Sequence, residues 1–202
     1  MNDTQRPLLI KISELISNIF NPLVSILLFF AYFSLHHFNV SEAVHYFLPA
    51  FLIVVAPVVV WIFWNVKAGR YKDANVSNRR ARMSLYLFLE ATLLAYLAYR
   101  YFREGETDFI VLFLLFLLVA MHISNYMVKS SMHTAVNVFV AALFSTENLW
   151  LGGFWVLLSI VVAITRVILK RHTVAEVIIG GLIGAFISII FLYTHIQLNN
   201  GI

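Results

Sequence analysis

Long hydrophobic segments alternate with short polar turns along the whole chain. A helix needs roughly 20 predominantly apolar residues to cross a bilayer, and most of these segments reach that length. The fifth is short, so it either crosses with its polar ends included or forms a partial or tilted helix. The pattern predicts an all-α, polytopic transmembrane bundle of six to seven spans. The seven apolar segments are Leu8–Leu35, Tyr46–Val66, Met83–Tyr101, Phe109–Met127, Thr134–Phe144, Leu149–Ile164 and Val174–Tyr193.

Two local patterns refine this prediction. Pro22 follows Asn21 inside the first apolar segment, where a proline predicts a kink. Gly180, Gly181 and Gly184 lie in the last segment at spacings that let a neighbouring helix approach closely.

Composition supports the membrane assignment. The chain has 202 residues, of which 61% are hydrophobic and only 12% charged, with a mean hydropathy of +0.87. A soluble domain of this size needs a more polar surface. We find no linker or internal repeat, so we expect one transmembrane domain over residues 1–202. The chain has no cysteine, which excludes disulfides, thiolate metal sites and a cysteine nucleophile.

Three polar segments converge on one side of the membrane if each apolar segment crosses it. They lie between spans two and three, four and five, and six and seven: Lys67–Arg82, Lys129–His133 and Arg166–His172. The prediction that these three segments share one side of the membrane follows from hydropathy alone.

The third polar segment has the most suggestive chemistry. If its end is helical, His172 and Glu176 are four residues apart and share one helix face. A carboxylate there can accept the proton of one ring nitrogen and leave the other nitrogen basic. Arg166 can offer a planar set of donors to a phosphate. The alternative is a basic turn between two membrane helices with a histidine at the lipid headgroups.

The other two segments supply complementary groups. Lys72 and Arg79 are cations separated by six residues, and Ser131 and His133 add a hydroxyl and a second imidazole. A phosphate ester needs cations around its oxygens, a nucleophile in line and an acid for the leaving oxygen. A metal site is less well supported, because no HExxH motif occurs and the surroundings are basic. We expect no metal and no other cofactor.

These motifs resemble those of the type 2 phosphatidic acid phosphatase superfamily, membrane lipid phosphatases related to vanadium haloperoxidases. The family motifs run lysine, six residues, arginine–proline; proline–serine–glycine–histidine; and serine–arginine, five residues, histidine, three residues, aspartate. The resemblance covers roughly residues 67–190. Here the motifs occur as Lys72 to Arg79 with Arg80, as Ser130-Ser131-Met132-His133, and as Thr165-Arg166 to His172 to Glu176.

The resemblance implies a role for each matching residue. His172 would be the nucleophile that forms a phosphohistidine, and Glu176 would orient it. His133 would protonate the leaving alcohol and then activate water. The phosphoryl oxygens would be held by Lys72, Arg79, Ser131 and Arg166.

The chain departs from the family pattern at five motif positions, and two apolar spans separate its first and second motifs. Met132 replaces a glycine where the backbone must approach the phosphate. Glu176 replaces aspartate and adds one methylene. The remaining replacements are Arg80 and Ser130 for proline and Thr165 for serine.

Several neighbouring residues have competing interpretations. Arg80 and Arg82 are alternatives to Arg79, although such a run is also typical of a lipid-headgroup anchor. Glu90 lies inside the third span, and we expect it to pair with an arginine of its own helix. Asn137 is one turn beyond His133 and could orient it or form a hydrogen bond between helices.

The distribution of basic residues bears on orientation. Twelve of the fourteen Lys and Arg residues lie on the motif side, and only Arg100 and Arg103 lie on the other. The positive-inside rule therefore favours a cytoplasmic site, whereas the family often places it on the outer face. We expect an integral protein of a bacterial plasma membrane.

The sequence predicts a metal-independent phosphatase that hydrolyses a lipid phosphate or lipid pyrophosphate, with the bilayer as its surroundings and no nucleic-acid partner. One alternative is phosphotransfer to the hydroxyl of another lipid. Another is a non-catalytic membrane protein that binds anionic headgroups, and a third is a small transporter.

Overall fold

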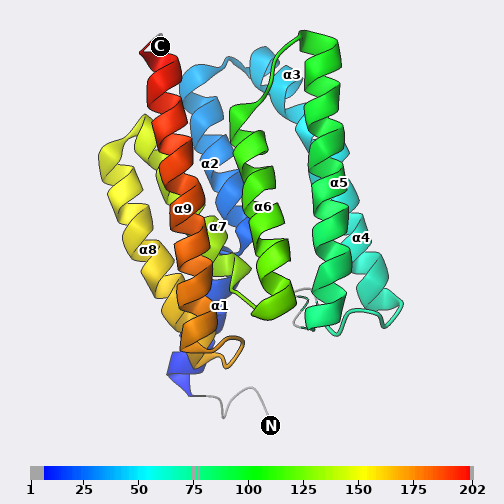
Figure 1. Ribbon diagram of the computed structural model, residues 1–202, viewed down its shortest axis with the longest axis vertical. Helices are drawn as coiled ribbons and strands as arrows, with labels where there is room; N and C mark the ends of the chain where they lie inside the picture. The colour runs from blue at the N-terminus through cyan, green and yellow to red at the C-terminus, as the bar shows by residue number, and fades with distance from the viewer. Residues whose placement is uncertain (1–6, 74–75, 77, 201–202) are drawn as a thin grey trace. The chain divides into compact units, whose positions relative to one another are not determined.

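The computed structural model describes residues 7–73, 76 and 78–200 (Figure 1). These residues form helices and connecting turns, with no β-strand among them, so the predicted all-α class is confirmed. The polar start, including Arg6 from the charge count, lies outside the described residues, as do residues 74, 75 and 77 of the long polar segment.

Contacts divide the chain into two compact units. Unit 1 comprises Met1–Phe33 and Val128–Ile202, and unit 2 comprises Ser34–Met127. The prediction of a single domain over the whole chain stays a prediction.

Five helical runs in the described chain are long and apolar enough to cross a membrane, and a bent pair raises the number to six. This agrees with the predicted helical membrane bundle. The five runs are Val40–Lys67, Arg79–Glu104, Phe109–Met127, Leu149–Ile168 and Val174–Asn199, and the bent pair joins Leu8–Ile19 to Pro22–His37.

Unit 1 is built around α7 (Met132–Glu147), which packs against α8 (Leu149–Ile168) and α9 (Val174–Asn199) (Figure 1). α7 has 16 residues and is therefore about 24 Å long. Nearly all of its side chains are buried, from His133 to Phe144 with one partial exception. The short fifth apolar segment is thus the central helix of this unit.

The first apolar segment breaks as predicted next to Pro22. α1 (Leu8–Ile19) and α2 (Pro22–His37) meet at 53°. A proline cannot donate to the preceding turn, and the Asn21 side chain instead accepts the Val24 N–H at 3.1 Å. The break exposes backbone carbonyls that need partners inside the membrane.

Asn137 of α7 supplies such a partner. Its side-chain Nδ2 donates to the carbonyl oxygens of Phe20, at the break, and His133. Its Oδ1 accepts from the Ser25 hydroxyl and from Trp155 Nε1. Asn137 is fully buried, so it ties α1, α2, α7 and α8 together. Of the two interpretations left open by the sequence, the structure shows the hydrogen bond between helices.

Two of the three glycines in α9 face α7 at close range. A Cβ atom at Gly180 would lie 2.6 Å from the Ser131 carbonyl oxygen, and one at Gly184 would lie 2.6 Å from the Ala135 carbonyl oxygen. At Gly181 the nearest atom would be Thr134 Cγ2 at 3.7 Å, an ordinary contact. The predicted close approach is confirmed for Gly180 and Gly184.

We expect Gly180→Ala to destabilise the protein by about 1–3 kcal/mol, because the added methyl group would meet backbone atoms. Gly181→Ala is the matched control one residue away. It adds the same methyl group in available space and should be neutral or stabilising by up to about 1 kcal/mol. Thermal unfolding in detergent measures both, and equal transition temperatures would contradict the prediction.

The first complete helical run of unit 2 is longer than expected. α3 (Val40–Ala50), a π-helical turn at Phe51–Val55 and α4 (Ala56–Lys67) form one run that starts before the predicted Tyr46. Asn39 and Glu42 form a capping box at its start. The π-helical turn follows Pro49, whose missing N–H disrupts the regular hydrogen-bond pattern.

α5 (Arg79–Glu104) and α6 (Phe109–Met127) pack side by side in unit 2 (Figure 1). The expectation that Glu90 pairs with an arginine of its own helix is wrong. Its carboxylate lies 2.9 Å from Nδ1 of His122 on α6. The partner on the adjacent helix is within reach because α5 and α6 are in contact along this face.

Candidate active site

His172 lies just beyond the end of α8, in a turn that determines its position. Lys170 has a left-handed φ of 53°, and its N–H donates to the Val167 carbonyl oxygen. The Arg171 and His172 N–H groups both donate to the Arg166 carbonyl oxygen, at 3.1 and 3.3 Å. This is a Schellman-type helix end. The five residues between Arg166 and His172 therefore form the turn that ends α8.

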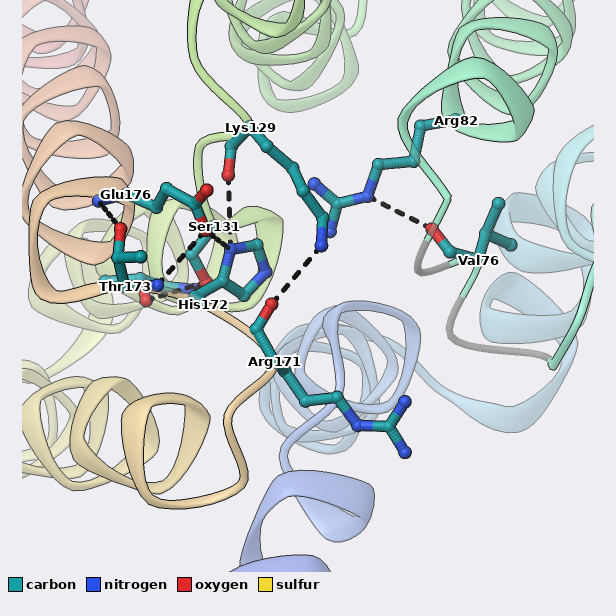
Figure 2. Close-up of polar contacts among 9 residues, drawn as sticks. Val76, Arg82, Lys129, Ser131, Arg171, His172, Thr173 and Glu176 are labelled. Carbon is teal, nitrogen blue, oxygen red and sulfur yellow. Dashed lines mark hydrogen bonds and ion pairs between the residues drawn. The ribbon is translucent and has the colours of Figure 1, made fainter.

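The hydrogen bonds of the imidazole assign its tautomer. Nδ1 of His172 lies 2.9 Å from Glu176 Oε2 and 3.1 Å from the Lys129 carbonyl oxygen (Figure 2). Both partners can only accept, so Nδ1 carries the hydrogen. In the neutral ring, Nε2 then carries the lone pair. The side chain is only 1% exposed, so the ring is held in this orientation.

Glu176 has a second role at the start of α9. Its Oε2 also accepts the Thr173 N–H at 3.2 Å, and the Thr173 hydroxyl accepts the Glu176 N–H at 3.2 Å. This is a capping box. One carboxylate therefore fixes both the helix start and the adjacent imidazole. The longer glutamate side chain is able to reach both partners from the third helical position.

The start of α7 lies against the start of α9. The Ser131 N–H donates to the Glu176 carbonyl oxygen at 3.0 Å, and Gly180 allows the approach. Ser131 is the N-cap of α7, and its hydroxyl oxygen accepts from the Thr134 N–H at 3.4 Å and the Thr134 hydroxyl at 3.1 Å. The second and third sequence motifs are thus neighbours in unit 1.

His133 is the second residue of α7 and is 6% exposed. It lies two residues beyond Ser131, at the end of the unit where the Ser131–Glu176 contact is made. Met132, which replaces the family glycine, is the first residue of the helix and has no positive φ. This substitution therefore introduces no backbone strain.

Arg166 is buried in the last turn of α8, at 3% exposure. Its Nη1 donates to the Ser17 hydroxyl at 2.7 Å, and Ser17 is itself buried on α1. α1 has an unusual distribution of side chains, because Ser13 and Ser17 are buried while most of its large apolar residues are exposed. The first half of the broken span therefore presents its polar side to the arginine.

The cations of the first motif belong to unit 2. Lys72 is exposed. Arg79 begins α5 and donates to the carbonyl oxygens of Asn125 and Tyr126, which lie in the last turn of α6. Arg82 is buried, and its Nε donates to the Val76 carbonyl oxygen at 3.2 Å (Figure 2). Their contribution to a phosphate site stays a prediction.

Three residues around the site were missed by sequence reasoning. Thr173 was readable from the pattern Thr-Val-Ala-Glu, which is a capping-box signature. Ser17 and the Lys129 carbonyl oxygen had no signal, because their contacts join residues far apart in the chain.

Among the residues that the structure describes, no group of three or more histidine, aspartate or glutamate side chains is arranged to hold a metal ion. The polar groups gathered in unit 1 are an imidazole with a carboxylate partner, a hydroxyl and basic side chains. A set of this kind is suited to binding an anion.

Comparisons with protein-family models, with curated proteins and with solved structures found no match to this chain. The arrangement of its own residues is therefore the basis for assigning a function.

Proposed function

We propose that the chain is a membrane phosphatase that hydrolyses a lipid phosphate or lipid pyrophosphate without a metal, through a phosphohistidine at His172. The observation that supports this proposal most directly is that Nδ1 of His172 lies within hydrogen-bond distance of two acceptors, the Glu176 carboxylate and the Lys129 carbonyl oxygen. They leave the lone pair on Nε2, as an in-line nucleophile requires.

The proposed reaction has two steps. Nε2 of His172 attacks phosphorus, the bond to the leaving oxygen breaks, and His133 gives that oxygen a proton. Water then attacks phosphorus while His133 takes its proton, the P–N bond breaks, and phosphate leaves. Arg166 and Ser131 stabilise the charge on the phosphoryl oxygens. The same role for Lys72 and Arg79 stays a prediction from the sequence motifs.

An apolar groove in unit 1 supports a lipid as the substrate. It has a volume of about 460 Å³ and is lined almost entirely by apolar side chains of α7, α8 and α9. Thr134, one residue from His133, lines this groove, as do Ile168 and Val174 on either side of the turn that carries His172. A hydrocarbon chain in this groove would keep its headgroup at the catalytic turn.

The competing functions make different predictions. A phosphotransferase would use the same phosphohistidine and pass the phosphoryl group to a lipid hydroxyl instead of water. A headgroup-binding protein would bind anionic lipids and turn none over.

The distribution of Lys and Arg residues favours a site on the cytoplasmic face of a plasma membrane.

The test is phosphate release from short-chain lipid phosphates by the purified protein in detergent. We expect release to continue with excess chelator and to be inhibited by vanadate, which mimics the pentacoordinate phosphorus. Addition of a lipid alcohol tests for transfer. Headgroup binding without turnover, or release that stops when metals are removed, would overturn the proposal.

A further inference from the structure

We propose that Lys129 is an additional phosphate-binding residue, supplied by the same unit as His172. This inference rests on the proposed phosphatase function. The sequence motifs assign no role to Lys129, which immediately precedes Ser130 in the connection from α6 to α7.

Two contacts place Lys129 at the catalytic turn. Its main-chain carbonyl oxygen accepts from Nδ1 of His172 at 3.1 Å. Its side-chain Nζ donates to the Arg171 carbonyl oxygen at 3.3 Å. In Figure 2 the side chain extends past the imidazole toward Arg171, the residue before His172. Both ends of Lys129 therefore contact the segment that carries the proposed nucleophile.

The chemistry of the ammonium group favours an anionic partner. A lysine has three N–H donors and a full positive charge, and the Lys129 ammonium makes a long hydrogen bond to a neutral carbonyl oxygen. A phosphoryl group on Nε2 of His172 would bring negatively charged oxygens to the same turn. Charge-assisted hydrogen bonds are shorter and stronger than neutral ones, so the ammonium would move from the carbonyl to the phosphoryl oxygens.

Substitution of the Lys129 side chain can separate the role of its main-chain carbonyl oxygen from the role of its ammonium group. Its main-chain carbonyl oxygen orients His172, and a side-chain substitution leaves that oxygen in place. Lys129→Met therefore removes the ammonium without removing the hydrogen bond to Nδ1. Lys129→Gln also removes the charge but keeps a polar N–H group on a slightly shorter side chain.

The experiment measures vanadate affinity by thermal stabilisation, together with KM and kcat for a short-chain lipid phosphate. We expect Lys129→Met and Lys129→Gln to weaken vanadate binding and raise KM by about 10- to 100-fold, the range for one charge-assisted hydrogen bond. Lys129→Arg keeps the charge and should stay within about threefold of the wild type.

Lys170→Met is the matched control. Lys170 is an exposed lysine in the same turn, so its removal changes the net charge equally and should alter vanadate affinity less than about twofold. Each variant's unfolding temperature without vanadate reports folding, and Lys129→Gln serves if Lys129→Met does not fold.

The two proposals fail differently. If the wild type neither releases phosphate nor binds vanadate, the proposed function is wrong. If the wild type is active and His172→Ala is not, but all Lys129 variants bind vanadate within twofold of the wild type, only the role of Lys129 is overturned. An equal effect of Lys170→Met would also overturn it, since the cause would be net charge.

Discussion

Replacing His172 with alanine should abolish phosphate release, with a loss of roughly three orders of magnitude or more. The variant has no imidazole to attack phosphorus, and Glu176 has no ring to orient. The same protein should fail to become labelled when it is incubated with a radiolabelled phosphate ester. Wild-type protein quenched during turnover should carry label that is stable to alkali and lost in acid, which is the behaviour of a phosphohistidine.

His133→Ala separates the two chemical steps. With an aryl phosphate, whose leaving group needs no proton, the first step should proceed and the second should stall, because no base activates water. Label should therefore accumulate on the protein. His195→Ala, on the same helix as Glu176 but near its far end, is the control and should turn over normally. Label on His172→Ala protein would place the nucleophile elsewhere.

Asn137→Leu should cause the largest loss of stability among the substitutions considered, about 3–5 kcal/mol. Leucine has the same branched shape but makes none of the four hydrogen bonds of the asparagine side chain. The Phe20 carbonyl oxygen and the Trp155 N–H would stay buried without these partners, and each such group costs about 1–3 kcal/mol. Thermal unfolding in detergent measures the effect.

Ser25→Ala provides a comparison within the same network. It removes one donor to Asn137, so we expect a loss of about 1 kcal/mol. The difference between the two variants tests whether Asn137 supports the break between α1 and α2. An Asn137→Leu protein as stable as Ser25→Ala would show that the break is held by other contacts.

Local sequence patterns predicted much of the fold. The apolar segments, the proline at the kink and the spacing of the glycines in α9 can each be read from residues that are near one another in the chain. Lipid imposes this regularity, because every backbone group inside a bilayer needs a partner and a helix supplies it locally. Helix ends were less predictable, since α5 begins at Arg79 instead of Met83.

The third motif was predictable for the same reason. A helix end followed by a new helix start repeats a fixed local geometry, so His172 and Glu176 could be paired from their spacing. The capping box formed by Thr173 is equally local and could have been read from the same four residues.

Contacts between distant residues were decided only by the tertiary structure. The sequence indicated an arginine of its own helix as the partner of Glu90, whereas the structure shows His122 of α6. The sequence also could not choose between two roles for Asn137. Ser17 reaches Arg166 across 149 positions, and Lys129 reaches His172 across 43. Apolar periodicity identifies which face of a helix is buried, whereas the packing of helices determines which polar groups meet there.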